Sequence, residues 1–188
     1  MTGERPARRA LPRLVWATAW VSFFADVSTE LVYGVLPAFY LGTLGLGVVW
    51  IGVIEGAAET VVAVTKLYSG ALSDRTGRRP VWMFFGYGLS TIAKPLIPLA
   101  GGGAGVAGLR VLDRLGKGVR GAPRDALIAG VVGEGERGRA FGVQRAMDHA
   151  GALVGGLLAA GLLWAGLVGA RALFWRSAVP GRAWRRWW

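Results

Sequence analysis

The sequence predicts an all-α protein, a polytopic transmembrane helical bundle. Hydrophobic residues make up 53% of the 188-residue chain, and the mean hydropathy is +0.44. These residues gather in segments of roughly 20 or more, the length that crosses a bilayer core. Short connections separate the segments, as between antiparallel neighbours in a helical bundle. Segments of this length, rich in Ala, Gly and Leu, argue against strands.

The pattern predicts five complete spans and the beginning of a sixth. A basic N-terminal stretch, residues 1–13, precedes them, and the helical bundle occupies residues 14–180. The spans are expected at residues 14–41, 48–72, 80–100, 106–132 and 141–163, and the truncated sixth at 172–180.

Basic residues occur in every second connection between the predicted spans. They precede the first span, fill the link from the second to the third, and recur between the fourth and the fifth. The intervening links, 42–50 and 101–108, contain no Lys or Arg. This positive-inside asymmetry predicts a multi-pass protein of the inner (plasma) membrane with a cytoplasmic N-terminus. It also argues against a nucleic-acid partner, because a nucleic-acid binder clusters its charge on one face of a soluble domain.

Several chemistries are excluded by composition and spacing. The chain has no Cys, so it has no disulfide framework, thiolate metal site or cysteine nucleophile. No metal-ligand spacing, phosphate loop or catalytic triad is present. The sequence therefore predicts a protein that is not an enzyme and that needs neither a cofactor nor a metal.

Ionisable residues lie inside the predicted spans, where each costs about 2.5–3.5 kcal/mol on insertion scales unless it faces a bundle interior or water. At about 100° per residue, each of four spans collects them on one face. The first carries Asp26 and Glu30, and the second carries Glu55, Glu59 and Lys66. The fifth carries Arg145, Asp148 and His149. The fourth carries Arg110, Asp113, Arg114, Lys117, Arg120, Arg124 and Asp125.

The simplest arrangement turns these four polar faces toward one shared polar space. The alternative is that the charges only pair with one another, and Asp113 with Arg110 or Lys117 has the helical spacing for this. Lys94, beside Pro95, is expected to extend its amine to the membrane interface. His149 is expected to be a packing residue rather than a proton relay.

Two pairs of glycines occur at helix-packing spacing, Gly52 with Gly56 and Gly151 with Gly155. Small residues four apart let membrane helices approach closely. The alternative is that glycine is simply abundant, since the chain contains 31.

The link between the second and third spans carries a specific motif, because residues 70–80 read GALSDRTGRRP. Gly70 allows close helix contact, Asp74 can pair with basic groups, and Gly77 permits a tight turn. The segment resembles the loop motif G-x-L-A-D-R-x-G-R-[RK] of the major facilitator superfamily, with Ser73 where Ala is usual. The matching residues are Gly70, Leu72, Asp74, Arg75, Gly77, Arg78 and Arg79.

Other segments extend the resemblance. Residues 114–118, RLGKG, are similar to the family's fourth-helix motif, and residues 26–30, DVSTE, are similar to a bacterial branch of the superfamily. The resemblance implies a secondary transporter of a small solute or drug, coupled to protons, in which two six-helix halves alternate access to a midplane site. It implies that Asp74 latches the gate between the halves.

The resemblance also implies that charged residues of the spans serve substrate binding or proton coupling. Those residues are Asp26, Glu30, Glu55, Glu59, Asp113, Arg114 and Asp148. Alternating exposure changes the proton affinity of a buried carboxylate, so such a group can load and release a proton.

The end of the chain, 181–188, does not suit a lipid-facing helix, because residues 182–188 read RAWRRWW. If the arginine codons are CGG, a shifted frame encodes Leu-Ala-Ala-Val-Val, which fits a sixth span. We therefore expect a frameshifted tail, a missing C-terminal half and no transport by this chain alone. The alternative is a non-transporting membrane interaction protein or a pseudogene product.

Overall fold

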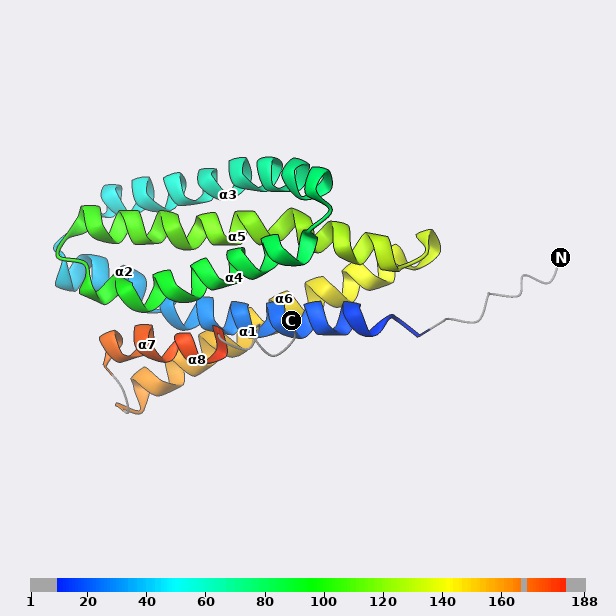
Figure 1. Cartoon of the computed structure of the whole chain (residues 1–188). Helices are drawn as coiled ribbons and strands as arrows, with labels where there is room; N and C mark the ends of the chain where they lie inside the picture. Colours follow the sequence, from blue (N-terminus) through cyan, green and yellow to red (C-terminus); the bar gives the residue numbers. More distant parts are fainter. Residues whose placement is uncertain (1–9, 167–168, 182–188) are drawn as a thin grey trace.

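The computed structural model describes residues 10–166 and 169–181. Five long helices organise this part of the chain: α1 (Arg13–Tyr33), α3 (Val48–Thr76), α4 (Arg79–Leu96), α5 (Gly103–Val131) and α6 (Arg137–Trp164) (Figure 1). The described residues contain no strand, so the predicted all-α class is confirmed. Residues 182–188, on which most of the expected aberrant tail falls, and residues 1–9 lie outside the described residues.

Short helical elements complete the fold. They are α2 (Leu36–Ala38), the π-helix η1 (Phe39–Thr43), the 3-10 turns η2 (Ile97–Leu99) and η3 (Glu134–Glu136), α7 (Ala170–Arg176) and α8 (Ala178–Gly181). The first apolar segment is thus not one straight helix. Pro37 stands in the first turn of α2, and proline removes an amide donor and clashes with the preceding turn of a helix. The α-helix therefore ends at Tyr33 and restarts at Leu36.

The long helices form two packed groups. Helix α5 packs along both α3 and α4, while α1 packs along α6 (Figure 1). An apolar cluster joins the groups at one end, where Phe39 of η1 contacts Phe174 of α7 with ring centroids 5.4 Å apart. A second cluster joins α1 to α4 through Val21, Met83 and Tyr87. Between these contacts the two groups face each other with charged side chains.

Glycine makes the close contacts within each group. A Cβ on Gly116 of α5 would lie 2.6 Å from the carbonyl oxygen of Gly86 on α4, and a Cβ on Gly155 of α6 would lie 2.7 Å from the carbonyl oxygen of Val27 on α1. The expected packing role therefore holds for Gly155 and its neighbour Gly151. Gly52 and Gly56 make no such contact with the described residues, because an added Cβ there would meet nothing within 4 Å.

Three helical segments are long and apolar enough to cross a membrane within the described ranges: Arg13–Thr43, Val48–Thr76 and Glu134–Trp164. Large apolar side chains such as Trp20, Phe85 and Leu157 lie exposed on the outside of the bundle, as expected for lipid contact. Helix α4 and the charge-rich helix α5 are not among these segments. The multi-pass helical class is therefore supported for three spans rather than five.

Candidate functional site: a charged cavity between two helix groups

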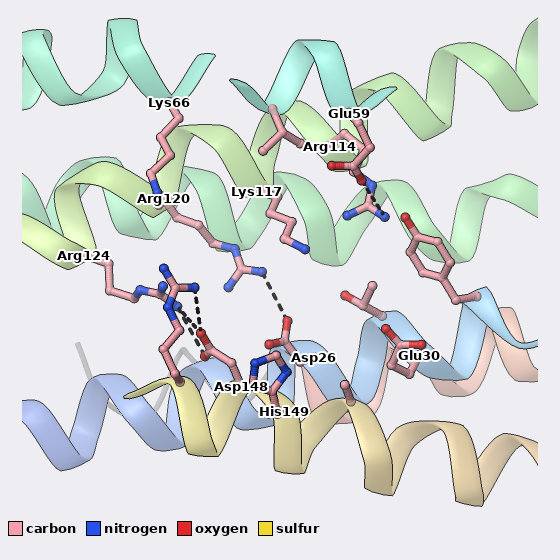
Figure 2. Close-up of a pocket in the computed structure, with 16 residues that line it drawn as sticks. Asp26, Glu30, Glu59, Lys66, Arg114, Lys117, Arg120, Arg124, Asp148 and His149 are labelled. Atoms are coloured by element: carbon pink, nitrogen blue, oxygen red, sulfur yellow. Dashed lines mark hydrogen bonds and ion pairs between the residues drawn. The ribbon is translucent and has the colours of Figure 1, made fainter. Parts of the chain in front are cut away.

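A cavity of about 460 Å³ lies between the two helix groups. Helices α3 and α5 form one wall, and α1 and α6 form the other (Figure 2). Four acidic side chains line it: Asp26, Glu30, Glu59 and Asp148. Six basic side chains line it: Lys66, Arg114, Lys117, Arg120, Arg124 and Arg145. His149 and Tyr33 also reach the cavity.

The packing of α5 explains why its cations face the cavity. Gly116 sits against α4, and a Cβ on Gly118 would lie 2.7 Å from Thr65 of α3. At these two contacts α5 lies too close to its neighbours for a side chain beyond glycine. The side chains of Arg114, Lys117 and Arg120 reach the cavity instead. The sequence pattern of small residues on one side and cations on the other thus builds the wall.

Ion pairs connect the two walls. Arg124 of α5 donates to Ser22 of α1 at 2.9 Å and approaches Asp148 of α6 at 3.3 Å. Gln144 donates to the same Asp148 carboxylate at 2.9 Å. Arg120 lies 3.9 Å from Asp26 (Figure 2). The contacts of Arg124 and Arg120 bridge α5 to α6 and α1, helices that make few other contacts with it, so electrostatics holds this side of the cavity together.

At the other side of the cavity, pairing is looser. Arg114 lies 3.3 Å from Glu59 of α3, whose side chain is 60% exposed. The Arg114 guanidinium also lies 4.6 Å from the Tyr33 ring centre, within cation–π range. Its Nε atom is buried with no hydrogen-bond partner. Arg114 is therefore only partly satisfied by the protein.

A separate buried cluster surrounds Arg110. Its guanidinium donates to both oxygens of Glu55, at 2.8 and 2.7 Å, and to Asp113 at 3.1 Å. Lys94 lies 3.9 Å from Asp113 and donates to Ser28 at 3.2 Å. The expectation that Lys94 reaches the membrane interface is wrong, because its side chain is 3% exposed. Asp113 and Ser28 replace water around its amine.

The loop motif lies at one end of the bundle, away from the cavity. Gly77 ends α3 with φ 65°, a left-handed conformation that favours glycine. Arg79 donates to Asp74 at 3.0 Å and to the carbonyl oxygen of Ala126 on α5 at 3.3 Å. Arg75, Arg78 and Leu72 are exposed. Within the described chain, Asp74 therefore pairs inside its own loop.

The cavity gathers some of the candidate site residues and not others. Asp26, Glu30, Glu59, Arg114 and Asp148 line it. Glu55 and Asp113 belong instead to the Arg110 cluster, as their 2.7 and 3.1 Å contacts with Arg110 show. Five further charged lining residues were not among the candidates: Lys66, Lys117, Arg120, Arg124 and Arg145. Their position on the charged faces of α3, α5 and α6 was the signal that could have identified them.

Fold and site together define a class: a helical membrane protein whose charged groups face an internal cavity instead of lipid. The profile of the Major Facilitator Superfamily matches residues 18–184. The chain therefore belongs to the major facilitator superfamily of transporters. Among the described residues, no group of His, Cys, Asp or Glu side chains could hold a metal ion.

Relatives agree with this membership. The chain is 34% identical over 150 residues to an uncharacterized MFS-type transporter of Methanocaldococcus jannaschii, covering 80% of this chain and 37% of the relative. It is 35% identical to an uncharacterized protein of Mycobacterium tuberculosis H37Rv, covering 81% and 37%. It is 30% identical to the multidrug resistance protein MdtH of Cronobacter sakazakii, covering 68% and 31%. The chain thus spans about a third of the length of these relatives.

Proposed function

We propose that this chain forms one half of a secondary transporter that moves a small solute or drug by alternating access. The observation that carries the proposal is the charged cavity between the two helix groups. Its walls bring ten charged side chains to one space of about 460 Å³ inside a bundle with an apolar exterior. Burying charges in this way is costly in a membrane, and a solute pathway is the usual reason for it.

All five long helices cross the bilayer in this proposal, and α7 and α8 begin a sixth span. The basic connections α3–α4 and α5–α6 lie at the end where α1 begins (Figure 1). The positive-inside rule then puts the N-terminus in the cytoplasm and the protein in the inner membrane. A second set of helices, as in the longer relatives, completes the pathway.

Protons drive the transport in this proposal, and Glu30 is the carboxylate best suited to carry one. Glu55 is held by two hydrogen bonds from Arg110, and Asp148 by Arg124 and Gln144. The Glu30 carboxylate lines the cavity without an ion pair or side-chain hydrogen bond to any described residue. A carboxylate free of fixed counter-ions can exchange its proton as water access changes. Asp26, 3.9 Å from Arg120, is the second candidate.

Asp74 serves as the gate latch in this proposal. Its side chain is 60% exposed and is held by a single ion pair with Arg79. An exposed pair of this kind is worth about 0–1 kcal/mol, so Asp74 can exchange Arg79 for a partner on the second half at little cost. Arg79 retains its bond to Ala126 when Asp74 leaves.

A cysteine-accessibility experiment tests the alternating pathway. The chain contains no Cys, so single cysteines can be labelled with a membrane-impermeant maleimide. Ala152 lines the cavity, while its neighbour Leu153 is 65% exposed on the outside of α6 at the same depth. We expect labelling of Ala152→Cys from both sides, in right-side-out and in inside-out vesicles. Leu153→Cys should resist labelling because lipid excludes the reagent.

Two outcomes would contradict the proposal. Labelling of Ala152→Cys from one side only would mean a static cavity and no alternating access. Equal labelling of Ala152→Cys and Leu153→Cys would mean that the cavity is no more hydrated than the lipid-facing surface.

A further inference from the structure

The cavity has more basic than acidic groups. Six basic side chains line it against four acidic ones. Five of the six have a carboxylate within 4 Å: Lys66 has Asp125, Arg114 has Glu59, Arg120 has Asp26, and Arg124 and Arg145 share Asp148. Lys117 has no ion pair with any residue that the structure describes. Lys117 is therefore the one basic group of the cavity without a carboxylate within 4 Å in the described part of the chain.

Lys117 stands between two incompletely satisfied arginines. Arg114 and Arg120 are 3% and 5% exposed, and the Nε atom of each is buried without a hydrogen-bond partner. The three residues follow one another at three-residue intervals on the cavity face of α5, over roughly 9 Å of helix. Figure 2 shows the Lys117 amine in the open space between the two guanidinium groups. Three cationic groups thus converge on one part of the cavity, and Lys117 is the one of the three without an ion pair to a described residue.

We propose that this space binds the anionic group, carboxylate or phosphate, of a small organic solute, with Lys117 as its counter-ion between Arg114 and Arg120. The inference rests on the proposed function, because the bound anion is the solute to be moved. A cationic solute would meet the surplus positive charge directly, and a neutral one would leave Lys117 uncompensated. Charge-assisted hydrogen bonds to a carboxylate or phosphate satisfy all three groups.

The opposite wall orients the solute. Glu30 lines the α1 side and has no counter-ion of its own within 4 Å in the described chain. A second anionic group near α1 would be repelled by Glu30 and by Asp26. The solute therefore places its anionic end against α5 and a neutral or amine-bearing end toward α1.

Ligand-induced stabilisation tests the site in the purified chain reconstituted in lipid nanodiscs. Inorganic phosphate and succinate are the anionic probes, and tetraethylammonium chloride at equal ionic strength is the cationic control. We expect a saturable rise in Tm, read by tryptophan fluorescence, with at least one anion and none with the control. A ligand that binds only the folded state raises Tm by mass action.

Three variants make the test specific. Lys117→Gln should weaken the apparent affinity for the anion about tenfold, the loss of one charge-assisted contact. Lys117→Arg should retain most of it, because the charge stays. Lys66→Gln removes a lysine charge from the same cavity, but one already paired with Asp125 at 3.5 Å, and should change the affinity less than about twofold.

Other results would overturn the proposal. These are no saturable rise with either anion, a rise with tetraethylammonium alone, or equal losses in Lys117→Gln and Lys66→Gln. The cysteine experiment separates the two proposals. Anion binding together with labelling from one side only would support the anion site and contradict alternating access. Labelling from both sides without anion binding would contradict only the proposed class of solute.

Discussion

Arg110 illustrates how a single residue can carry charge inside a membrane bundle. Its side chain is 1% exposed, and it donates to Glu55 and Asp113 while its guanidinium lies 3.9 Å from the Tyr33 ring centre. The hydroxyls of Tyr33 and Tyr40 each donate to Glu55 at 3.4 Å. Every charge in this cluster therefore depends on a partner from another turn or another helix.

Replacing Arg110→Met should destabilise the fold strongly. The change leaves the buried Asp113 carboxylate with only Lys94, at 3.9 Å, and breaking a buried pair by removing one partner costs about 3–5 kcal/mol. Thermal unfolding in detergent measures the loss. Arg145→Met is the matched control, because the Arg145 side chain is 59% exposed and its pair with Asp148 is 3.8 Å long. Equal stability of the two variants would contradict the structural role of the Arg110 cluster.

Gly77 is the subject of a second prediction about a single residue. Its φ of 65° terminates α3, and a Cβ there costs about 1–2 kcal/mol even though the surrounding space is open. Gly77→Ala should therefore lower the free energy of unfolding by that amount. Gly133→Ala, at φ −65° and equally open, should be neutral. Similar losses in both would show that the left-handed turn at Gly77 is not responsible.

Glycine contacts decide the packing of whole elements. Gly155 and Gly56 both belong to small-residue pairs, but only Gly155 faces a neighbouring helix at close range. Gly155→Leu should separate α6 from α1 and abolish the monodisperse peak in size-exclusion chromatography. Gly56→Leu should leave the peak intact, because nothing described lies within 4 Å of its added Cβ. A tolerated Gly155→Leu would mean that α1 and α6 do not pack as described.

At the scale of helices, the sequence predicted local features better than it predicted which residues far apart in the chain contact each other. Apolar segment length and the loop motif of residues 70–80 predicted the helical class and the family, because both signals lie within one contiguous stretch. Lys94 was assigned wrongly because its partner Ser28 lies 66 residues away. Glu55 and Glu59 share one face of α3, yet only Glu59 reaches the cavity. Which of the two reaches the cavity depends on where along its length α3 crosses α5. The angle of a residue around the helix axis does not reveal this.

For the molecule as a whole, charge is the feature that organises the interior. The two helix groups are apolar outside and meet through ion pairs such as Arg124 with Asp148 and Arg120 with Asp26. A charged side chain can leave one partner and pair with another at similar energy. A close-packed apolar contact, in contrast, cannot slide without opening voids. An interior built in this way is suited to the rearrangement that alternating access requires.

The strictest test of a charged membrane interior is whether helix α5 crosses the bilayer. It carries seven charged residues from Arg110 to Asp125 and is not one of the three segments that are apolar enough to span a membrane. We expect α5 to cross the bilayer nonetheless, since the carboxylates of Glu55, Asp26 and Asp148 compensate Arg110, Arg120 and Arg124. Gly101 and Gly135 flank it, each with open space around it. In intact cells, an impermeant maleimide should label Gly101→Cys, and it should label Gly135→Cys only after permeabilisation. Labelling of both from one side would mean that α5 does not span the membrane, and the positive-inside orientation would then lose its basis at this end of the bundle.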